Sequence, residues 1–332
     1  MEIEELLKKF SVETMTSISN QIKTSPSFIL DRFYTKKEAV LGTSAEVIIK
    51  RGAGVLLESV SNDAEHLMTK TDDAYILNIP LPRFPLVDNI TASDMATLRS
   101  LNSSKAIAET LAVKIGEKLA KQKRDIITTM EFMAVGSLFG VITDGKGKEL
   151  FKFTSRKESI KLDKTSATGK KNIETSLSEI TRAIIAEFGT TQGFEIFCGY
   201  DFISTLAKKA DEEDLFNKGA RAAWKNSGDT RTLSILGVDF TPYEAIYKDA
   251  KGKDKSFLDS DKAIVVPKNL DAFTHYYARA IHVEALGRSP ELFFSASPER
   301  LAKGQGYAII TESRNIPICN RPDAILHLEF KD

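Results

Sequence analysis

Cysteine and histidine are scarce in this chain. It has two cysteines, Cys198 and Cys319, and four histidines, at positions 66, 275, 282 and 327, among 332 residues. The cysteines lie far apart with no C-x-x-C partner, and the histidines do not cluster, whereas a zinc site needs about four converging nitrogen and sulfur ligands. We therefore expect no metal site and no disulfide, and we expect both cysteines to be small buried apolar residues.

The chain also lacks an excess of charge of either sign. Forty-six Lys and Arg residues balance forty-six Asp and Glu residues. Proteins that hold nucleic acid mainly through its phosphates usually carry a basic excess, so nucleic-acid binding of this kind is not expected as the main role. The apolar runs are all shorter than the roughly 18 residues of a membrane span, and the acidic start Met1–Glu5 is unlike a signal peptide, so no membrane association is expected.

Recognisable catalytic motifs are missing as well. The sequence contains no G-x-S-x-G, H-E-x-x-H or G-x-G-x-x-G. The segment Gly140–Gly147 approaches a phosphate-binding loop, but its eighth position is glycine instead of Ser or Thr, and a hairpin turn explains its glycines better. His275 and His282 lie in text typical of strands. We expect neither enzymatic activity nor a cofactor.

The first 82 residues contain apolar surface that they cannot bury locally. Residues 1–37 begin with an amphipathic helix and read as an arm, which packs either on its own domain or on a neighbouring subunit. Residues 38–82 read as a two-stranded hairpin with a polar tip at 61–73, and such a hairpin is marginal alone in water. Both features indicate assembly. The residues that carry the two patterns are Ile3, Leu6, Leu7 and Phe10 in the helix, and Val47, Ile49, Val55 and Leu57 in the strands.

The strongest helical pattern covers residues 104–136. Apolar residues recur about every four positions from Ile107 to Met133, and a helix of this length would span roughly 50 Å. An alternative is that Gly116 or Gly136 splits it into two ordinary helices. Basic residues are expected on its other faces: Lys105, Lys114, Lys118, Lys121, Lys123 and Arg124.

The rest of the chain alternates between shorter helices and strands. Residues 138–154 predict a hairpin around Asp144–Gly147. Asp201 is expected to cap the second of two predicted helices. The predicted helices are 173–188 and 202–210, and the predicted strands are 194–198, 232–235, 238–241 and 263–266, with a charged loop at 248–261.

The end of the chain carries the most specific pattern. Two prolines, Pro317 and Pro322, bracket what reads as a short polar loop, and the alternation from Ala324 to Phe330 predicts a terminal strand. The segment 315–323 reads N-x-P-x-C-x-R-P-D. It resembles the close of the tailed-phage major capsid proteins of the lambda type, the major capsid protein E family.

A second segment carries the same resemblance. Residues 79–90 are similar to the family's I-P-x-I-P-L-E-D-x-I segment, which joins two parts of the subunit. Here Arg83 and Phe84 add one residue to the spacing, and Asp88 stands where an acidic residue is expected.

The resemblance implies an α+β chain with the Hong Kong 97-type phage capsid fold. It implies an N-terminal arm at 1–37 and an extended hairpin, the E-loop, at 38–82. A peripheral domain would follow at 83–169 and 288–316, with a spine helix at 104–136. An axial domain would comprise 170–287 and 317–332.

The function that the resemblance implies is that of a major capsid protein. Pentamers and hexamers would form an icosahedral head shell that encloses double-stranded DNA, in a virion assembled in the host cytoplasm. Scaffold, portal and decoration proteins are candidate partners. An encapsulin-like compartment of the same fold and a soluble binding protein remain alternatives. The candidate inter-subunit contacts are Ile3, Leu6, Leu7, Phe10, Val47, Ile49, Val55, Leu57, Arg83 and Asp88.

Overall fold

The computed structural model divides the chain into two compact units. It describes residues 9–24, 27–50, 75–91, 93–94, 104–153, 158–166, 169–217, 221–227, 230–249 and 251–331. The first unit comprises the described residues of Met1–Glu46, Asn78–Ala134 and Thr274–Ile318, and the second those of Val47–Leu77, Val135–Phe273 and Cys319–Asp332. Both units are therefore discontinuous in sequence.

The long helix is continuous. Helix α5 runs over Ser104–Phe139, 36 residues, which corresponds to about 54 Å. Gly116 has open space around the position of a Cβ, so it does not interrupt the helix. At Gly136 a Cβ would lie 2.8 Å from the carbonyl oxygen of Val141, so this glycine permits close packing of the following strand. The alternative of two separate helices is wrong.

The first unit is built on a sheet whose central strand is β18. The sheet order is β1-β15-β18-β16, and β4 and β17 also pair with β18. β4 runs antiparallel to β18 from Arg83 opposite Arg314 to Thr91 opposite Gly306. The bounds are β1 Lys37–Val40, β4 Arg83–Thr91, β15 Phe273–Ala278, β16 Phe294–Ser295, β17 Glu299–Arg300 and β18 Gly306–Cys319.

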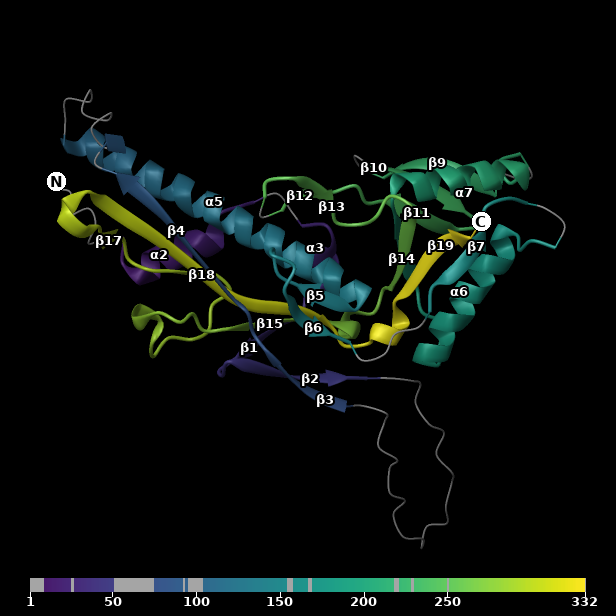
Figure 1. The fold of residues 1–332 in the computed structure, drawn as a ribbon, viewed down its shortest axis with the longest axis horizontal. Helices are drawn as coiled ribbons and strands as arrows, with labels where there is room; N and C mark the ends of the chain where they lie inside the picture. Colours follow the sequence, from purple (N-terminus) through teal and green to yellow (C-terminus); the bar gives the residue numbers. More distant parts are fainter. Residues whose placement is uncertain are drawn as a thin grey trace, which may run out of the picture. The chain divides into compact units, whose positions relative to one another are not determined.

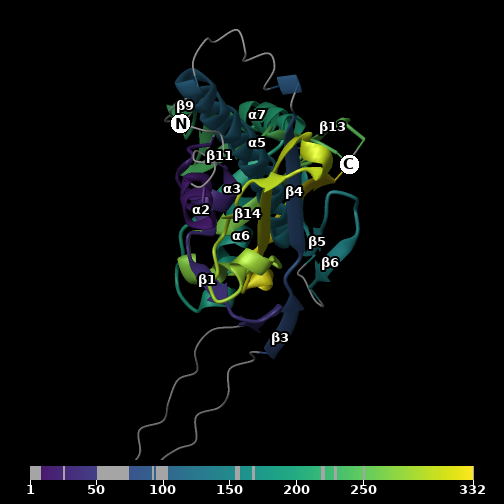
Figure 2. The same ribbon diagram turned by 90° about the vertical axis from the view of Figure 1, so that its left-hand side faces the viewer.

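Two N-terminal helices belong to the same unit. Helix α2, Val12–Gln21, begins at the N-cap Ser11, whose side chain accepts a hydrogen bond from the Thr14 amide. Helix α3, Ile29–Phe33, follows it. Both views place these helices beside α5 (Figures 1 and 2). Helix α2 shares a core with α5 and the sheet: Met15, Ile90, Leu111, Ile115, Leu119 and Ile309.

The described part of the predicted arm therefore folds on its own unit. Sequence analysis had missed α2 and had placed an amphipathic helix on residues 3–10 instead. Residues 1–8 lie outside the described part of the chain. The predicted hairpin is described only near its base, where β2, Ser44–Ile49, pairs with β3, Tyr75–Pro80. Its predicted tip lies outside the described residues.

The second unit contains a seven-stranded sheet in the order β7-β19-β14-β8-β11-β10-β9. Helices α6, Ile173–Phe188, and α7, Tyr200–Glu212, pack against it through one apolar cluster that includes Ile180, Leu206 and Val265. The strands are β7 Ile160–Asp163, β8 Phe194–Cys198, β9 Ala222–Ser227, β10 Thr230–Ile235, β11 Val238–Pro242, β14 Lys262–Pro267 and β19 Leu326–Lys331.

The terminal strand alternates as the sequence predicts. Leu326 and Leu328 of β19 lie in the apolar cluster, whereas His327 points away from it. His327 Nε2 lies 3.1 Å from the carbonyl oxygen of Leu138 and its ring contacts Phe139. The period-two pattern of Ala324 to Phe330 is thus explained by a strand with two different buried faces.

Several smaller predictions are confirmed. Helix 173–188 and strand 194–198 have the predicted bounds. The hairpin at 138–154 forms from β5, Val141–Thr143, and β6, Glu149–Lys152, and the amides of Lys146 and Lys148 donate to Asp144.

Three local predictions are wrong. Helix α7 begins at Tyr200 with Gly199 as its N-cap, so Asp201 lies in the first turn and accepts a hydrogen bond from Ser260 instead of capping the helix. The charged segment 248–261 contains a short hairpin of β12, Ile246–Lys248, and β13, Asp254–Ser256. The first part of the polar loop predicted between Pro317 and Pro322 is strand instead, because Pro317–Cys319 form the buried end of β18.

The domain boundaries drawn from the sequence stay predictions. The change from the second unit to the first at Thr274 lies inside the segment assigned to the axial domain. Secondary structure shows where strands and helices begin, but it does not by itself test the division into arm, E-loop, peripheral and axial parts.

Candidate assembly surfaces

Two charged residues of α5 meet the facing ends of α2 and α3. Lys123 Nζ donates to the carbonyl oxygens of Asn20 and Ile22, at 2.9 and 2.8 Å, at the C-terminus of α2. The carboxylate of Glu131 accepts from the amides of Ile29 and Leu30, each at 2.8 Å, at the N-terminus of α3. A cation at a helix C-terminus and an anion at a helix N-terminus both complement the helix dipole. We call Lys123 and Glu131 the spine clamp.

The spine clamp is buried, and the sequence did not reveal it. Lys123 is 6% exposed, although it had been assigned to a solvent-facing side of the helix. Burial, and secondarily the charge of Lys37, lowers the pKa of Lys123. Each charged group is satisfied by two backbone partners, which is the condition under which a buried charge is tolerated. The clamp therefore fixes the C-terminus of α2 and the N-terminus of α3 on α5.

A chain of buried hydroxyl and amide groups fixes α2 to the sheet. Ser19 Oγ lies 2.6 Å from Ser295 Oγ, which lies 3.0 Å from Thr311 Oγ1. Thr311 Oγ1 donates to Gln122 Oε1 at 2.7 Å, and Gln122 Nε2 donates to the carbonyl oxygen of Ile309 at 2.9 Å. These bonds connect α2, β16, β18 and α5. Polar contacts of this kind specify one position of α2 more sharply than apolar packing alone.

Two of the predicted contact residues form ion pairs within the first unit. Arg83 pairs with the buried carboxylate of Glu312 at 2.7 Å, while its own side chain remains 45% exposed. Asp88 lies 3.7 Å from Lys118 Nζ and 3.4 Å from Lys121 Nζ. Both residues therefore have partners inside the chain and still reach the surface.

The other predicted contact residues fall into three groups. Phe10 is partly buried against the apolar core of the first unit. Val47 and Ile49 have no exposed surface in the isolated chain. Five residues lie outside the described part of the chain, in the segments 1–8 and 51–74: Ile3, Leu6, Leu7, Val55 and Leu57.

Sequence analysis missed a short apolar segment that is exposed. Ile281, Val283 and Leu286 are 56%, 80% and 70% exposed. We call these three side chains the apolar loop patch. The segment is held in place, because the Ile281 amide donates to Glu312 Oε1 at 2.6 Å and the Ser297 amide donates to Glu284 Oε2 at 2.8 Å. Apolar side chains exposed on a fixed backbone are typical of a contact surface.

No site for metal or thiol chemistry was found in the described residues. Among them, no group of three His, Cys, Asp or Glu side chains is placed to hold a metal ion. Cys198 and Cys319 are free and buried, as predicted. Burial raises the pKa of both thiols, that of Cys319 to about 12, so they carry no reactive thiolate near neutral pH. Within the searched residues, no helix is long and apolar enough to cross a membrane.

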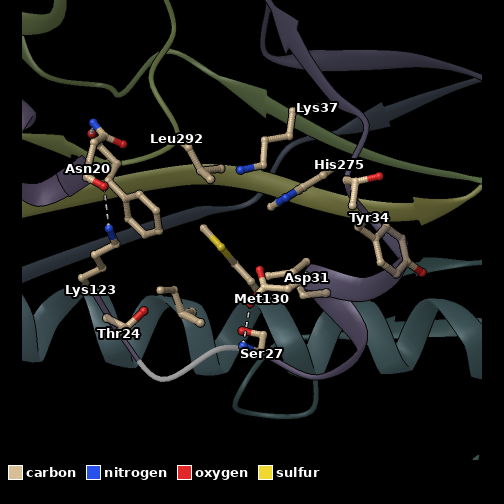
Figure 3. Close-up of a pocket in the computed structure, with 14 residues that line it drawn as sticks. Asn20, Thr24, Ser27, Asp31, Tyr34, Lys37, Lys123, Met130, His275 and Leu292 are labelled. Atoms are coloured by element: carbon tan, nitrogen blue, oxygen red, sulfur yellow. Dashed lines mark hydrogen bonds between the residues drawn. The ribbon is translucent and has the colours of Figure 1, made fainter. Parts of the chain in front are cut away.

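A cavity of about 540 Å³ lies in the first unit between α5 and the N-terminal segment. Figure 3 shows Lys37 and His275 side by side at its sheet side and Lys123 opposite them, on α5. Lys37 and His275 are register partners on the parallel strands β1 and β15. His275 Nε2 lies 2.9 Å from Asn315 Oδ1, and the Asn315 amide group donates to Ser313 Oγ, which assigns the proton to Nε2.

His275 is expected to make the first unit less stable in mild acid. Burial, opposed by the Asn315 hydrogen bond and assisted by Lys37, lowers the pKa of His275 from 6.5 to about 4. As the pH falls, the unfolded chain therefore protonates this histidine before the folded chain does. The contribution of neutral His275 to the free energy of unfolding is fully present above about pH 6.5 and is lost as the pH drops toward 4. The full loss is roughly 3 kcal/mol. Urea denaturation of wild type and His275→Gln at pH 7 and 4.5 measures it.

The matched control for this titration is His282→Gln. The wild type and the control should lose the same stability between the two pH values, and His275→Gln should lose less. An equal acid loss in all three proteins would contradict the assignment to His275.

Comparisons with known proteins agree with this fold. A family model described as "Phage major capsid protein E" matches residues 11–330. A candidate capsid protein from a prophage of Escherichia coli CFT073 is similar with a TM-score of 0.60 at 13% identity, covering 97% of this chain and 99% of that one. No curated protein matches the chain.

Two further solved structures are similar at lower scores. A phage-related protein from Bordetella bronchiseptica RB50 has a TM-score of 0.49 at 8% identity, covering 96% of each chain. The capsid structure of the cyanophage P-SCSP1u has a TM-score of 0.48 at 14% identity, covering 94% of this chain and 92% of that one. These two carry no part of the argument, and the prophage protein supports the fold alone.

The fold is the Hong Kong 97-type capsid fold, as the closing motif and the segment 79–90 had implied. The family model covers nearly the whole chain, including both of those segments, and it describes structural proteins of the phage head, not enzymes. The encapsulin-like alternative is thereby disfavoured. The chain belongs to the phage major capsid protein E family, and its role is that of the major capsid protein that forms the head shell of a virion.

Proposed function

We propose that this chain assembles into pentamers and hexamers that close into an icosahedral shell around double-stranded DNA. The observation that carries the proposal is the family match over residues 11–330. The apolar loop patch and the exposed part of Arg83 supply surface for contacts between copies. Copies of one chain can occupy pentamers and hexamers only if some contacts are retained while others adapt.

The apolar loop patch and Arg83 meet at one residue. Glu312 accepts from the Ile281 amide and pairs with Arg83, and Arg83 Nη2 also donates to the Ile281 carbonyl at 3.3 Å. The patch therefore has a charged rim, in the arrangement of an apolar centre with polar surroundings that interfaces commonly use. We propose a second copy of this chain as its occupant, because shell formation requires contacts between copies.

Replacing the apolar loop patch should impair assembly and leave folding intact. We expect Val283→Ser combined with Leu286→Ser to reduce the yield of closed shells at least tenfold, because a loss at one contact is repeated at every copy in the shell. Both side chains are exposed, so the unassembled subunit should unfold at a temperature close to that of the wild type. Electron microscopy and analytical ultracentrifugation measure the yield.

The control variant is Ile246→Ser, which removes a similarly exposed apolar side chain from β12 in the second unit. It should assemble like the wild type. Normal shells from the double variant would exclude the apolar loop patch from the essential contacts, without contradicting shell formation itself.

Expression alone and with a candidate scaffold tests the assembly as a whole. Closed shells, or rings of five and six subunits, are the expected products. A monomer or dimer under every condition would contradict the proposed oligomers. We also propose that packaged DNA is enclosed without sequence-specific binding. The balanced charge of the chain also gives no general basic excess for holding the DNA phosphates. Portal and decoration proteins remain proposed partners.

A further inference from the structure

The cavity between α5 and the N-terminal segment has two chemically different parts. One part is apolar, with Leu30, Ile127, Met130, Leu292 and Phe293 in its lining. The other is polar and rich in hydrogen-bond donors: it includes the hydroxyl groups of Thr24, Ser27 and Thr35 and the ammonium groups of Lys37 and Lys123. Its volume of about 540 Å³ lies within the range of small-molecule sites.

The charges around the cavity do not balance. Lys37, Lys123 and His275 are the basic residues of the lining, and Asp31 is the acidic residue that the described lining contains. Lys123 already donates to two carbonyl oxygens, and Asp31 accepts from the Ser27 amide at 2.7 Å. His275 is neutral near pH 7 for the reason given above. Two lysines and one aspartate therefore leave the lining of the cavity with a net charge of one positive unit.

Lys37 carries that unbalanced charge. Within the described part of the chain its ammonium group makes neither a hydrogen bond nor an ion pair. In Figure 3 its side chain extends over the cavity next to His275 and toward Leu292. Strand β1, paired with β15, thus holds Lys37 over the apolar part of the lining. The donors of its ammonium group face a space in which the described residues place no acceptor.

We propose that this cavity binds a small organic carboxylate, with the carboxylate group on Lys37 and a short apolar body on Met130, Leu292 and Phe293. A monoanion cancels the single unbalanced charge, and an ammonium–carboxylate hydrogen bond is stronger than one between neutral groups. The apolar floor favours an aliphatic or aromatic carboxylate over inorganic phosphate, which would leave that surface without a contact. The proposal goes beyond shell formation and does not depend on it.

Thermal unfolding of the full-length unassembled chain tests the proposal. The probes are sodium hexanoate, sodium benzoate and inorganic phosphate, each compared with sodium chloride at the same ionic strength. Hexanoate or benzoate at about ten times its dissociation constant is expected to raise the unfolding temperature by about 3 °C, with saturation. Phosphate is expected to match sodium chloride.

The variants assign the effect to Lys37. Lys37→Gln should abolish the shift, Lys37→Arg should retain it, and Lys36→Gln should retain it because Lys36 is the adjacent exposed lysine outside the lining. The unliganded unfolding temperatures of all variants are measured first, so that a folding defect is recognised separately.

Three outcomes would overturn the proposal. They are no carboxylate shift beyond that of sodium chloride, an equal shift in Lys37→Gln, or a larger shift with phosphate than with either organic acid. Shell formation by Lys37→Gln, observed by electron microscopy, is expected to be normal, so failure of carboxylate binding is distinguishable from failure of assembly.

Discussion

Glu131→Ala is expected to destabilise the chain by about 3 kcal/mol. The change removes a buried carboxylate that accepts from the amides of both Ile29 and Leu30, and it leaves those two donors without their acceptor. Hydrogen bonds to charged groups contribute about 1.5–3 kcal/mol each. A buried donor left without a partner destabilises the folded state by more than an average hydrogen bond stabilises it. Alanine favours the helix itself, so the loss measures the tertiary contact.

Urea denaturation of the unassembled chain measures the free energy of unfolding. Hydrogen exchange at the amides of Ile29 and Leu30 gives a local readout, and it should accelerate strongly. The control is Glu117→Ala on the same helix, whose exposed carboxylate pairs with Lys114 and should change stability by no more than about 0.5 kcal/mol. Unchanged exchange at the two amides would show that Glu131 does not hold α3.

Gly199→Ala is expected to destabilise the second unit by about 3 kcal/mol or more. A Cβ at this position would overlap the backbone of Asp259 and Ser260, including both carbonyl oxygens. The backbone φ of Gly199 is −74°, a value that alanine adopts freely, so the effect is steric and not conformational. The neighbouring backbone cannot move easily, because the Phe202 amide donates to the Ser260 carbonyl at 2.9 Å.

Gly145→Ala is the matched control for this variant. Gly145 lies in the turn between β5 and β6, and a Cβ there would meet nothing within 4 Å. Its stability should lie within about 0.5 kcal/mol of the wild type. The yield of soluble protein and its urea midpoint measure both variants. A Gly199→Ala protein as stable as Gly145→Ala would mean that the 259–260 backbone yields at little cost.

The sequence predicted best where local chemistry determines structure. Helix 173–188 carries its apolar residues at helical spacing, its N-cap Asn172 accepts from the Thr175 amide, and Gly189 ends it with a φ of 71°. These signals lie within one segment, so they can be identified without knowledge of the fold. The same is true of the hairpin around Asp144–Gly147.

Sequence reasoning failed where the partner of a polar group lies far away in the chain. Glu312, Ser313 and Asn315 are polar and yet buried in β18, where Arg83, Leu292 and His275 are the partners of their side chains. The apolar loop patch was missed for a related reason, because the residue types of Val283 and Leu286 do not reveal that their side chains are exposed. The predicted contacts in the arm tip and hairpin tip fall outside the described residues.

Local motifs and periodicities were enough to identify the family, the long helix, the terminal strand and the inert buried cysteines. The inward orientation of Lys123 and Glu131 became apparent only in the folded chain. On a helix whose Lys114, Lys118 and Lys121 reach the surface, nothing local distinguishes these two residues. Their burial is tolerated because two helix ends, about a hundred residues away in sequence, supply the carbonyl and amide groups that replace water.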